Sequence, residues 1–246
     1  MRIEVKNLSK RFGGLKALDR VSLVATGGEV TALIGPNGAG KSTFLDCVTG
    51  VVPIDEGSVT IDGTALPRYP LGKLVDLGIT RTFQNLRLFE SLTALEHLVL
   101  ARHSLRSRAR GRRTGQAKPV EAECLDILER VGLRDRAGMW PSELSYGERR
   151  RLEIARGLAI EPRLLLLDEP AAGSTRSEQV TLAKLITDIA TAGTAVILVE
   201  HHMDLVARVA KHIVVLNFGQ VLMTGDIDQV RSHPAVISAY LGTSQH

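Results

Sequence analysis

The chain has 246 residues, of which 44% are hydrophobic and 24% are charged. These values are ordinary for a globular protein, and they exclude a disordered chain. The length is sufficient to bury a full core, in one large α/β domain or in a domain with a smaller lobe. The formal net charge of +4 is mild, so it indicates no strong electrostatic attraction to nucleic acid.

The sequence contains neither a membrane-span pattern nor a secretory-signal pattern. No apolar run approaches the roughly 18 to 20 residues that cross a bilayer, and the start MRIEVKNLSK lacks an apolar segment. We therefore expect a cytoplasmic chain. Cys47 and Cys124 are isolated, with no CxxC pair and no histidine at metal-ligand spacing. This pattern favours reduced thiols over a disulfide or a zinc site.

The first third of the chain is typical of β-structure. Residues 21–35, VSLVATGGEVTALIG, hold two apolar runs separated by Gly27 and Gly28, which predicts a strand, a turn and a strand. Residues 57–63, GSVTIDG, predict a short strand closed by an Asp-Gly turn. Residues 78–84, GITRTFQ, form a further β-prone run.

A helical pattern follows over residues 92–131, where apolar residues recur at positions 92, 95, 98 and 99 and again at 124, 125, 127 and 128. We interpret this region as a helical insertion. Within it, residues 102–118, RHSLRSRARGRRTGQAK, are basic and poor in apolar residues. They favour a solvated charge run, as a mobile loop or a helix end, with membrane headgroups or RNA as the alternative partners.

From residue 164 onward, apolar strands alternate with helices. Strands are predicted at residues 164–168, 194–200 and 212–217, and helices over residues 178–192 and 203–210. Strands this apolar are buried on both faces, which is typical of a parallel sheet with helices packed around it.

The motif GPNGAGKST is the most informative part of the chain. It fits G-x-x-x-x-G-K-[ST] directly after an apolar strand and before a helical run. The glycines let backbone N–H groups point at phosphate oxygens, Lys41 adds positive charge at the β and γ phosphates, and Ser42 would ligate Mg²⁺. The predicted nucleotide-binding residues are Gly35, Pro36, Asn37, Gly38, Ala39, Gly40, Lys41, Ser42 and Thr43.

The segment LLLLDEP brings two acids to the carboxyl edge of the sheet, where α/β sheets bind ligands. Asp168 ends the strand and can hold Mg²⁺. Glu169 lies one residue further and can polarise a water for in-line attack on the γ-phosphate. Adjacent acids at a strand end often form only a turn, but the P-loop in the same chain favours the catalytic interpretation.

The segment LSYGERRR places Ser145 and Gly147 in front of an arginine-rich helical run. A helix start offers unpaired N–H groups and the positive end of a dipole, so it can bind an anion. An ordinary capped helix, with Ser145 as the N-cap, is at least as well favoured by these residues alone.

Taken together, the motifs resemble the ATP-binding subunits of ABC transporters over nearly the whole chain. GPNGAGKST, Gln84, LSYGE, LLLLDEP and His201 occur in that family's order and spacing. RTFQNLRLF, DEPAAG, VEHHMDLV and AYLG are similar to the ATPase subunit of branched-chain amino acid importers, and the lipopolysaccharide-export ATPase is a close alternative.

The resemblance implies an α/β P-loop NTPase core with a mixed, largely parallel sheet, an antiparallel N-terminal β part and a helical insertion subdomain. One cassette would span residues 1–246. Residues 1–85 and 160–246 would form its core, and the helical subdomain would extend from about residue 90 to residue 158.

The resemblance also implies roles for individual residues. Two subunits would pair head to tail, and the signature of one would close over ATP on the P-loop of the other. Phe12 resembles the aromatic residue that stacks on adenine. Gln84 matches the glutamine that reaches Mg²⁺ and the attacking water, and His201 matches the switch histidine that contacts the γ-phosphate. The signature residues are Leu144, Ser145, Tyr146, Gly147 and Glu148.

Several residues depart from the family pattern. Tyr146 stands in place of a glycine and Glu148 in place of a glutamine, and His202 replaces an aspartate that commonly follows the switch histidine. Residues 174–176, Ser-Thr-Arg, stand where Leu, then Asp or Asn, then Pro would be usual. We expect this last departure to weaken communication between the two ATP sites.

We therefore predict an Mg²⁺-dependent ATPase that binds ATP and powers import at the cytoplasmic face of the inner membrane. Its expected partners are a sister ATPase subunit, identical or paralogous, separate membrane permeases and, indirectly, an extracytoplasmic solute-binding protein. The segment LRLFESL, residues 86–92, and the helical insertion would receive a coupling helix from a permease. No nucleic acid is expected as a partner.

Three rival interpretations are weaker. A nucleic-acid-associated ABC protein would place the arginines of residues 102–113 on phosphates, but such families usually carry tandem cassettes or long coiled coils, which this chain lacks. Lys41, Asp168, Glu169 and His201 are intact, which argues against a regulator that binds nucleotide without hydrolysing it. A plain P-loop kinase would leave the signature and the switch histidine without a role.

Overall fold

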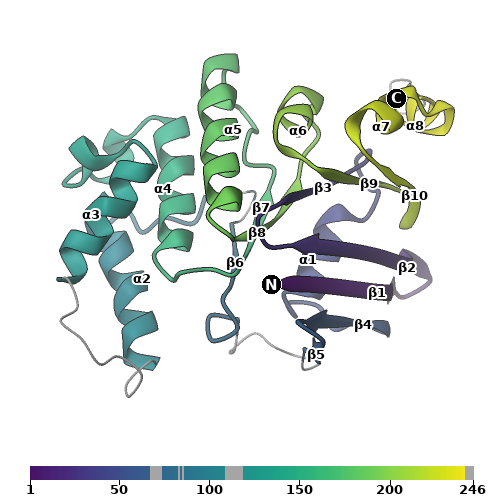
Figure 1. Cartoon of the computed structure of the whole chain (residues 1–246), viewed down its shortest axis with the longest axis horizontal. Helices are drawn as coiled ribbons and strands as arrows, with labels where there is room; N and C mark the ends of the chain where they lie inside the picture. The colour runs from purple at the N-terminus through teal and green to yellow at the C-terminus, as the bar shows by residue number, and fades with distance from the viewer. Residues whose placement is uncertain (67–73, 83, 85, 109–118, 242–246) are drawn as a thin grey trace.

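Figure 1 shows the protein as a computed structural model that describes residues 1–66, 74–82, 84, 86–108 and 119–241. The described residues form two β-sheets with helices packed around them, in agreement with the predicted α/β class. Among the described residues, no helix has the length and the apolar character needed to cross a membrane.

The N-terminal sheet is antiparallel, with the strand order β2-β1-β4-β5. Ile3 in the first strand lies opposite Ala25 in the second and Ile61 in the third. All three side chains are buried, so one face of this sheet packs on the core. The strands are β1 (Arg2–Phe12), β2 (Leu15–Thr26), β4 (Glu56–Ile61) and β5 (Thr64–Ala65).

The central sheet has the order β10-β9-β3-β8-β7-β6 and is parallel except for β10, which pairs antiparallel with β9. Every residue of β3, β7 and β8 is buried, which explains why these strands read as continuous apolar runs. The strands are β3 (Val30–Ile34), β6 (Ile79–Arg81), β7 (Leu164–Asp168), β8 (Ala195–Val199), β9 (His212–Asn217) and β10 (Gln220–Gly225).

Helices cover both faces of the central sheet. Phe44 of α1 shares one apolar cluster with Leu18 of β2 and Leu164 of β7, so α1 lies between the two sheets. On the opposite face, Leu182 of α5 shares a second cluster with Leu165 of β7. The helices are α1 (Lys41–Val48), α5 (Arg176–Thr191), α6 (Met203–Val209), α7 (Ile227–Ser232) and α8 (Pro234–Leu241), the last three packing beside β9 and β10.

The remaining helices stand together at one side of the molecule, away from the antiparallel sheet (Figure 1). Leu98, Cys124 and Leu128, which the helical periodicity marked as apolar positions, are fully buried there. These helices are α2 (Ala94–Arg108), α3 (Val120–Arg130), α4 (Tyr146–Leu158) and the short 3₁₀ turns η2 (Arg134–Arg136) and η3 (Pro141–Glu143). The predicted helical insertion is confirmed.

The basic segment at residues 102–118 begins inside α2, and residues 109–118 lie outside the described part of the chain. Arg102 is buried, and its guanidinium donates to Glu123 Oε2 at 2.8 Å, to the backbone oxygen of Ala159 at 3.1 Å and to Glu161 Oε1 at 2.6 Å. The expectation of a solvated charge is therefore wrong for Arg102. Its charge ties α2 to α3 and to the residues after α4.

Two smaller details refine the predictions. Helix α5 begins at Arg176, ahead of the predicted residue 178, because Thr175 caps it and accepts the N–H of Glu178. Cys47 and Cys124 are buried and are not joined in a disulfide, and burial raises the pKa of the Cys47 thiol to about 11. Such a thiol stays protonated and unreactive near neutral pH.

Candidate functional site

The P-loop connects the end of β3 to the start of α1. Gly35, with φ +149°, has no room for a side chain, because a Cβ there would lie 2.2 Å from the backbone oxygen of Leu216. Gly40 has φ +103°, and its Cβ would lie 2.7 Å from the oxygen of Ala17. The glycine spacing of the motif is thus required by close backbone approach from β9 and β2.

Lys41 is the first residue of α1 and is buried. Its Nζ donates to the backbone oxygens of Gly35, at 2.8 Å, and Pro36, at 3.0 Å. Burial lowers the pKa of the Lys41 ammonium, and the negative charges of Glu169 and Asp168 oppose that shift. The loop therefore encloses a cation at the place where the motif predicts a phosphate.

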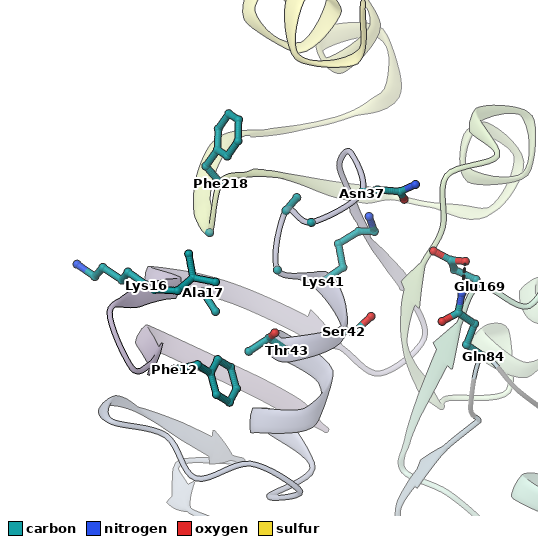
Figure 2. A pocket seen from close by; sticks show the side chains of 15 residues that line it. Phe12, Lys16, Ala17, Asn37, Lys41, Ser42, Thr43, Gln84, Glu169 and Phe218 are labelled. Atoms are coloured by element: carbon teal, nitrogen blue, oxygen red, sulfur yellow. Dashed lines mark hydrogen bonds between the residues drawn. The ribbon is translucent and has the colours of Figure 1, made fainter. Parts of the chain in front are cut away.

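A cavity of about 450 Å³ lies beside the P-loop and contains most of the predicted ATP-binding residues (Figure 2). It extends from the end of β1 and the start of β2, past the P-loop, to the turn after β7. Its walls are formed by Phe12, Leu15, Lys16, Ala17, Asn37, Gly38, Ala39, Gly40, Lys41, Ser42, Thr43, Gln84, Glu169, Phe218 and Gly219.

Phe12 ends β1 at one side of this cavity, and Gln84 and Glu169 lie at the opposite side in Figure 2. The phenyl ring is 48% exposed, and Lys10 Nζ lies 5.3 Å from its centroid. An exposed aromatic face at a cavity rim can stack on a planar ligand. The geometry thus leaves Phe12 free of the core, which was the alternative for a lone phenylalanine near a strand.

The turn between β9 and β10 forms a wall that sequence reasoning missed. The N–H of Gly219 donates to Ala39 O at 3.0 Å, and its oxygen accepts the N–H of Asp19 at 2.8 Å. These bonds tie the P-loop to β2. Gly219 also has φ +74° and no room for a side chain against Ala17. The signal was a single glycine after an apolar strand, which many turns share.

The acidic edge is built from β7 and the loop after β6. Asp168 is buried, and its Oδ2 accepts from Arg81 Nη2 at 2.9 Å. Arg81 also bonds to Asp46 on α1. Sequence reasoning did not identify Arg81, although a lone arginine in a strand beside an apolar sheet is a sign of a buried carboxylate partner. The salt bridges link the P-loop helix to the end of β7.

Glu169 follows β7 in a left-handed backbone conformation with φ +46°. Its Oε2 accepts from Gln84 Nε2 at 3.2 Å, and its Oε1 lies 3.8 Å from His201 Nδ1. The structure therefore brings together three of the predicted catalytic side chains. The predicted magnesium ligands, Ser42, Gln84 and Asp168, offer a hydroxyl, an amide and a carboxylate oxygen, which fit a hard divalent cation.

His201 follows β8 and has a 46% exposed side chain. The preceding residue, Glu200, is fully buried and accepts several hydrogen bonds from the loops around it. Ligand atoms of Glu200, His201 and His202 lie within 4.8 Å of one another. Glu200 was missed, because the sequence gives no sign that an acid beside a histidine is buried.

The signature residues lie at the start of α4. Ser145 Oγ accepts the N–H of Glu148 at 3.2 Å, and Glu148 Oε2 accepts the N–H of Ser145 at 2.8 Å. This reciprocal capping box makes Ser145 the N-cap. None of the residues that line the described cavity belongs to the signature. The structure does not bring the signature to the P-loop of its own chain.

Gly147 lies against helix α5. A Cβ at Gly147 would lie 2.3 Å from Glu178 Oε1, so no side chain fits there without displacing Glu178. Tyr146 lies close to Gly173, in the loop between Glu169 and α5, since a Cβ on Gly173 would lie 3.5 Å from the Tyr146 ring. The signature and the loop after Glu169 therefore form one packed unit.

Comparison with known families decides what this arrangement is. Residues 18–172 match the family described as ABC transporter. The chain belongs to the ABC transporter family. As a member of it, the chain is an ATPase. Residues 220–246 match a second family, described as branched-chain amino acid ATP-binding cassette transporter.

Individual relatives agree with this assignment. The high-affinity branched-chain amino acid transport ATP-binding protein BraF of Pseudomonas aeruginosa is 41% identical over 98% of this chain and 97% of its own length. LivG of Escherichia coli K12, which carries the same description, is 39% identical over 98% of this chain and 97% of its own length.

Solved structures of cassettes share the fold. The ADP conformation of an ABC transporter cassette matches with a TM-score of 0.87 at 30% identity, covering 98% of this chain and 99% of the other. A dimeric cassette in a post-hydrolysis state, bound to ADP and Pi, matches with a TM-score of 0.75 at 29% identity, over 92% of this chain and 98% of the other.

Proposed function

We propose that this chain is the ATP-hydrolysing subunit of an importer for branched-chain amino acids. The observation that carries this proposal is the match of residues 220–246 to the branched-chain cassette family, since β10, α7 and α8 lie in this segment beside the P-loop. The 41% identity to BraF over nearly the whole chain supports the same solute class.

We assign the nucleotide to the cavity beside the P-loop. Phe12 stacks on the adenine, and the triphosphate follows the P-loop toward Lys41 and the N-terminus of α1. Lys41 then exchanges its backbone acceptors, Gly35 and Pro36, for the oxygens of the β and γ phosphates. The lysine is already buried at the place of use, so little side-chain freedom is lost when the phosphate binds.

Ser42, Asp168 and Gln84 hold the Mg²⁺ ion that accompanies ATP. When bound, this ion neutralises charge on the β and γ phosphates. Glu169 accepts the proton of the attacking water, and Gln84, whose amide already reaches Glu169 at 3.2 Å, orients that water. His201, whose Nδ1 lies 3.8 Å from Glu169 Oε1, donates to the γ-phosphate.

The signature completes the site of a second subunit. Ser145 and the N–H of Gly147 lie at the start of α4, outside the cavity of their own chain. A helix start offers hydrogen-bond donors to an anion, and a head-to-tail dimer supplies that anion as the γ-phosphate on the partner's P-loop. ATP then joins two subunits, and hydrolysis releases them. A related cassette bound to ADP and Pi is dimeric, which supports a dimer of this chain.

The loop ahead of α2 faces the membrane partners. Phe89 is 54% exposed, and its N–H donates to His97 Nε2 at 2.9 Å, while His97 Nδ1 lies 2.8 Å from Thr93 O. Burial lowers the pKa of His97, which keeps the imidazole neutral and able to accept that bond. We assign the surface at Phe89 to a permease, at the cytoplasmic face of the inner membrane, with an extracytoplasmic protein that delivers the solute.

Mixed dimers test the composite site. Ser145→Arg and Lys41→Ala chains should each be nearly inactive alone. Mixing them should restore part of the ATPase activity, because one site then combines an intact P-loop with an intact signature. The control is a mixture of Ser145→Arg with a chain that carries both changes, in which no complete site can form. Mixed dimers that form without any recovery would remove the signature from its assigned role.

The solute is tested by uptake. The chain is co-expressed with permeases and a solute-binding protein from the same organism, in cells that lack their own branched-chain amino acid uptake. Labelled leucine, isoleucine and valine should enter in an ATP-dependent way that Glu169→Gln abolishes. Glutamine is the comparison solute, because a glutamine transport ATP-binding protein of Escherichia coli is 33% identical to this chain. Uptake of glutamine alone would overturn the assignment.

A further inference from the structure

Glu200 lies between β8 and His201, and the proposed function gives it no role. Its side chain is entirely buried, and its carboxylate accepts from two different loops. Oε1 accepts the N–H of Ala171 at 2.8 Å. Oε2 accepts the N–H groups of His201, at 2.9 Å, and His202, at 3.0 Å, and it lies 2.9 Å from His202 Nδ1.

Each of these loops carries one of the assigned catalytic groups. Ala171 lies two residues after Glu169, in the turn that the bond from the Ala172 N–H to Glu169 O closes at 3.2 Å. Glu169 itself has φ +46°, a left-handed conformation that is unfavourable for a residue with a side chain. Such a conformation persists only when the surrounding structure holds it. On the other side, Glu200 binds the backbone of His201 itself.

We propose that Glu200 is a positioning residue that fixes the distance between the side chains of Glu169 and His201. Its two oxygens hold the backbone of both loops, so the carboxylate that activates water and the imidazole that senses the γ-phosphate keep the spacing that the structure records, 3.8 Å between Glu169 Oε1 and His201 Nδ1. The inference rests on the roles that the proposed function gives to those two residues.

A carboxylate suits this position better than other side chains. It accepts at roughly four lone-pair sites and donates nothing, and three backbone N–H groups and the Nδ1 of His202 converge on it here. A glutamine at this position would turn an NH₂ group toward backbone donors, so at least one loop would lose its partner. An aspartate would keep the charge but is one methylene shorter, so it could not reach both loops.

The test compares turnover with binding in the purified full-length chain. Glu200→Gln should lower kcat by about 10- to 100-fold, because a displacement of catalytic groups by about 1 Å has such an effect. ATP affinity should change by less than about three-fold, since uniform binding is untouched. The matched control is Glu123→Gln, which removes a carboxylate partner of the buried Arg102 far from the cavity and should leave kcat unchanged.

A double-mutant cycle separates positioning from general stability. If Glu200 acts by holding Glu169 and His201 in register, its loss has little further effect once His201 is absent. Glu200→Gln combined with His201→Ala should therefore turn over within about three-fold of His201→Ala alone. If the double variant instead loses kcat by the product of the two single-variant factors, the inference is overturned. If Glu200→Gln does not fold, Glu200→Asp carries the same cycle, with a loss of kcat expected because aspartate also fails to hold both loops.

Failure of this inference can be told apart from failure of the proposed function. Wild-type chain that hydrolyses ATP, together with an inactive Glu169→Gln variant, supports the assigned chemistry whatever Glu200 does. Against that background, wild-type kcat in Glu200→Gln would overturn the positioning role alone. Activity retained by Glu169→Gln would overturn the proposed function instead.

Discussion

Two helix starts in this protein are assigned to phosphate, and they are built differently. Helix α1 begins after Gly40, which has φ +103° and no side chain to cap the helix. Helix α4 begins after Ser145, whose hydroxyl and backbone take part in a capping box with Glu148. The first start leaves its N–H groups for a ligand of the same chain. The second is already satisfied in part and is stable without a ligand.

A buried arginine braces each of these helices, again in different ways. Arg81 pairs with Asp46 on α1 and with Asp168 at the end of β7, so it fixes the P-loop helix to the acidic edge of the sheet. Arg150 on α4 bonds to the backbone oxygen of Gln84 and, at 3.0 Å, to the hydroxyl of Tyr146. The α1 side is thus joined to the residues of its own cavity, while the α4 side is joined to the loop that we assign to a membrane partner.

The largest expected effect comes from removing the brace on the α1 side. Arg81→Leu should lower the free energy of unfolding by about 3 kcal/mol, because the buried Asp168 carboxylate loses its partner. Asp46 is about one-third exposed, so water compensates for part of its loss. Urea denaturation measures the change. Arg163→Leu is the control, since its pair with Asp62 is half exposed and should matter far less. Equal losses would contradict a special role for Arg81.

The second effect concerns the affinity of the P-loop at the start of α1 for ATP. Lys41→Ala should weaken ATP binding by about 10- to 100-fold, as expected for the loss of a charged hydrogen bond to phosphate. Equilibrium binding of a fluorescent ATP analogue measures it. Lys184→Ala, an exposed lysine on α5, serves as a control for the loss of one positive charge. Unchanged affinity in Lys41→Ala would contradict the P-loop assignment.

On the α4 side the expected effect is smaller and of another kind. Ser145→Ala should lower the free energy of unfolding by about 1 kcal/mol, since it removes the N-cap, while ATP binding to the monomer stays unchanged. Ser145→Asn keeps a good N-cap but lacks the hydroxyl. If the hydroxyl serves only the capping box, Ser145→Asn should keep full ATPase activity. If it also meets the partner's phosphate, Ser145→Asn should be stable yet slow, and we expect this second result.

The difference between the two sides also explains what the sequence could predict. The P-loop, the strands around it and the paired acids are local patterns whose residues serve the same chain, so spacing alone indicated the site. Arg81, Glu200 and Gly219 act through contacts with residues far along the chain. The local signs of Arg81 and Gly219, a lone arginine in a strand and a single glycine after one, are shared by many other sites and do not identify their distant partners. For the same reason the burial of Arg102 was not predicted, because a basic run gives no sign of distant carboxylates.

The smallest expected effect concerns the loop at residues 174–176, where Ser, Thr and Arg replace the usual residues of the family. The Thr175 hydroxyl is already engaged, because it lies 2.8 Å from Glu178 Oε2 and accepts the Glu178 N–H at 3.3 Å. It is therefore poorly placed to bridge to the P-loop of a second subunit. Asparagine is a good N-cap and proline is well tolerated at the first helical position, so the variant Ser174→Leu, Thr175→Asn, Arg176→Pro should fold normally.

This triple variant should tighten the ATP-driven dimer. One added interfacial hydrogen bond contributes about 0.5 to 1.5 kcal/mol, which corresponds to about a 2- to 10-fold shift in the closed population. Dimer formation against ATP concentration, measured in the Glu169→Gln background, gives the shift directly. Thr175→Asn alone separates the new side chain from the stiffening by proline. Curves that coincide with the parent would mean that contacts elsewhere in the dimer already compensate for this loop. The signature at the start of α4 would then act independently of the loop at residues 174–176, although the two are packed together.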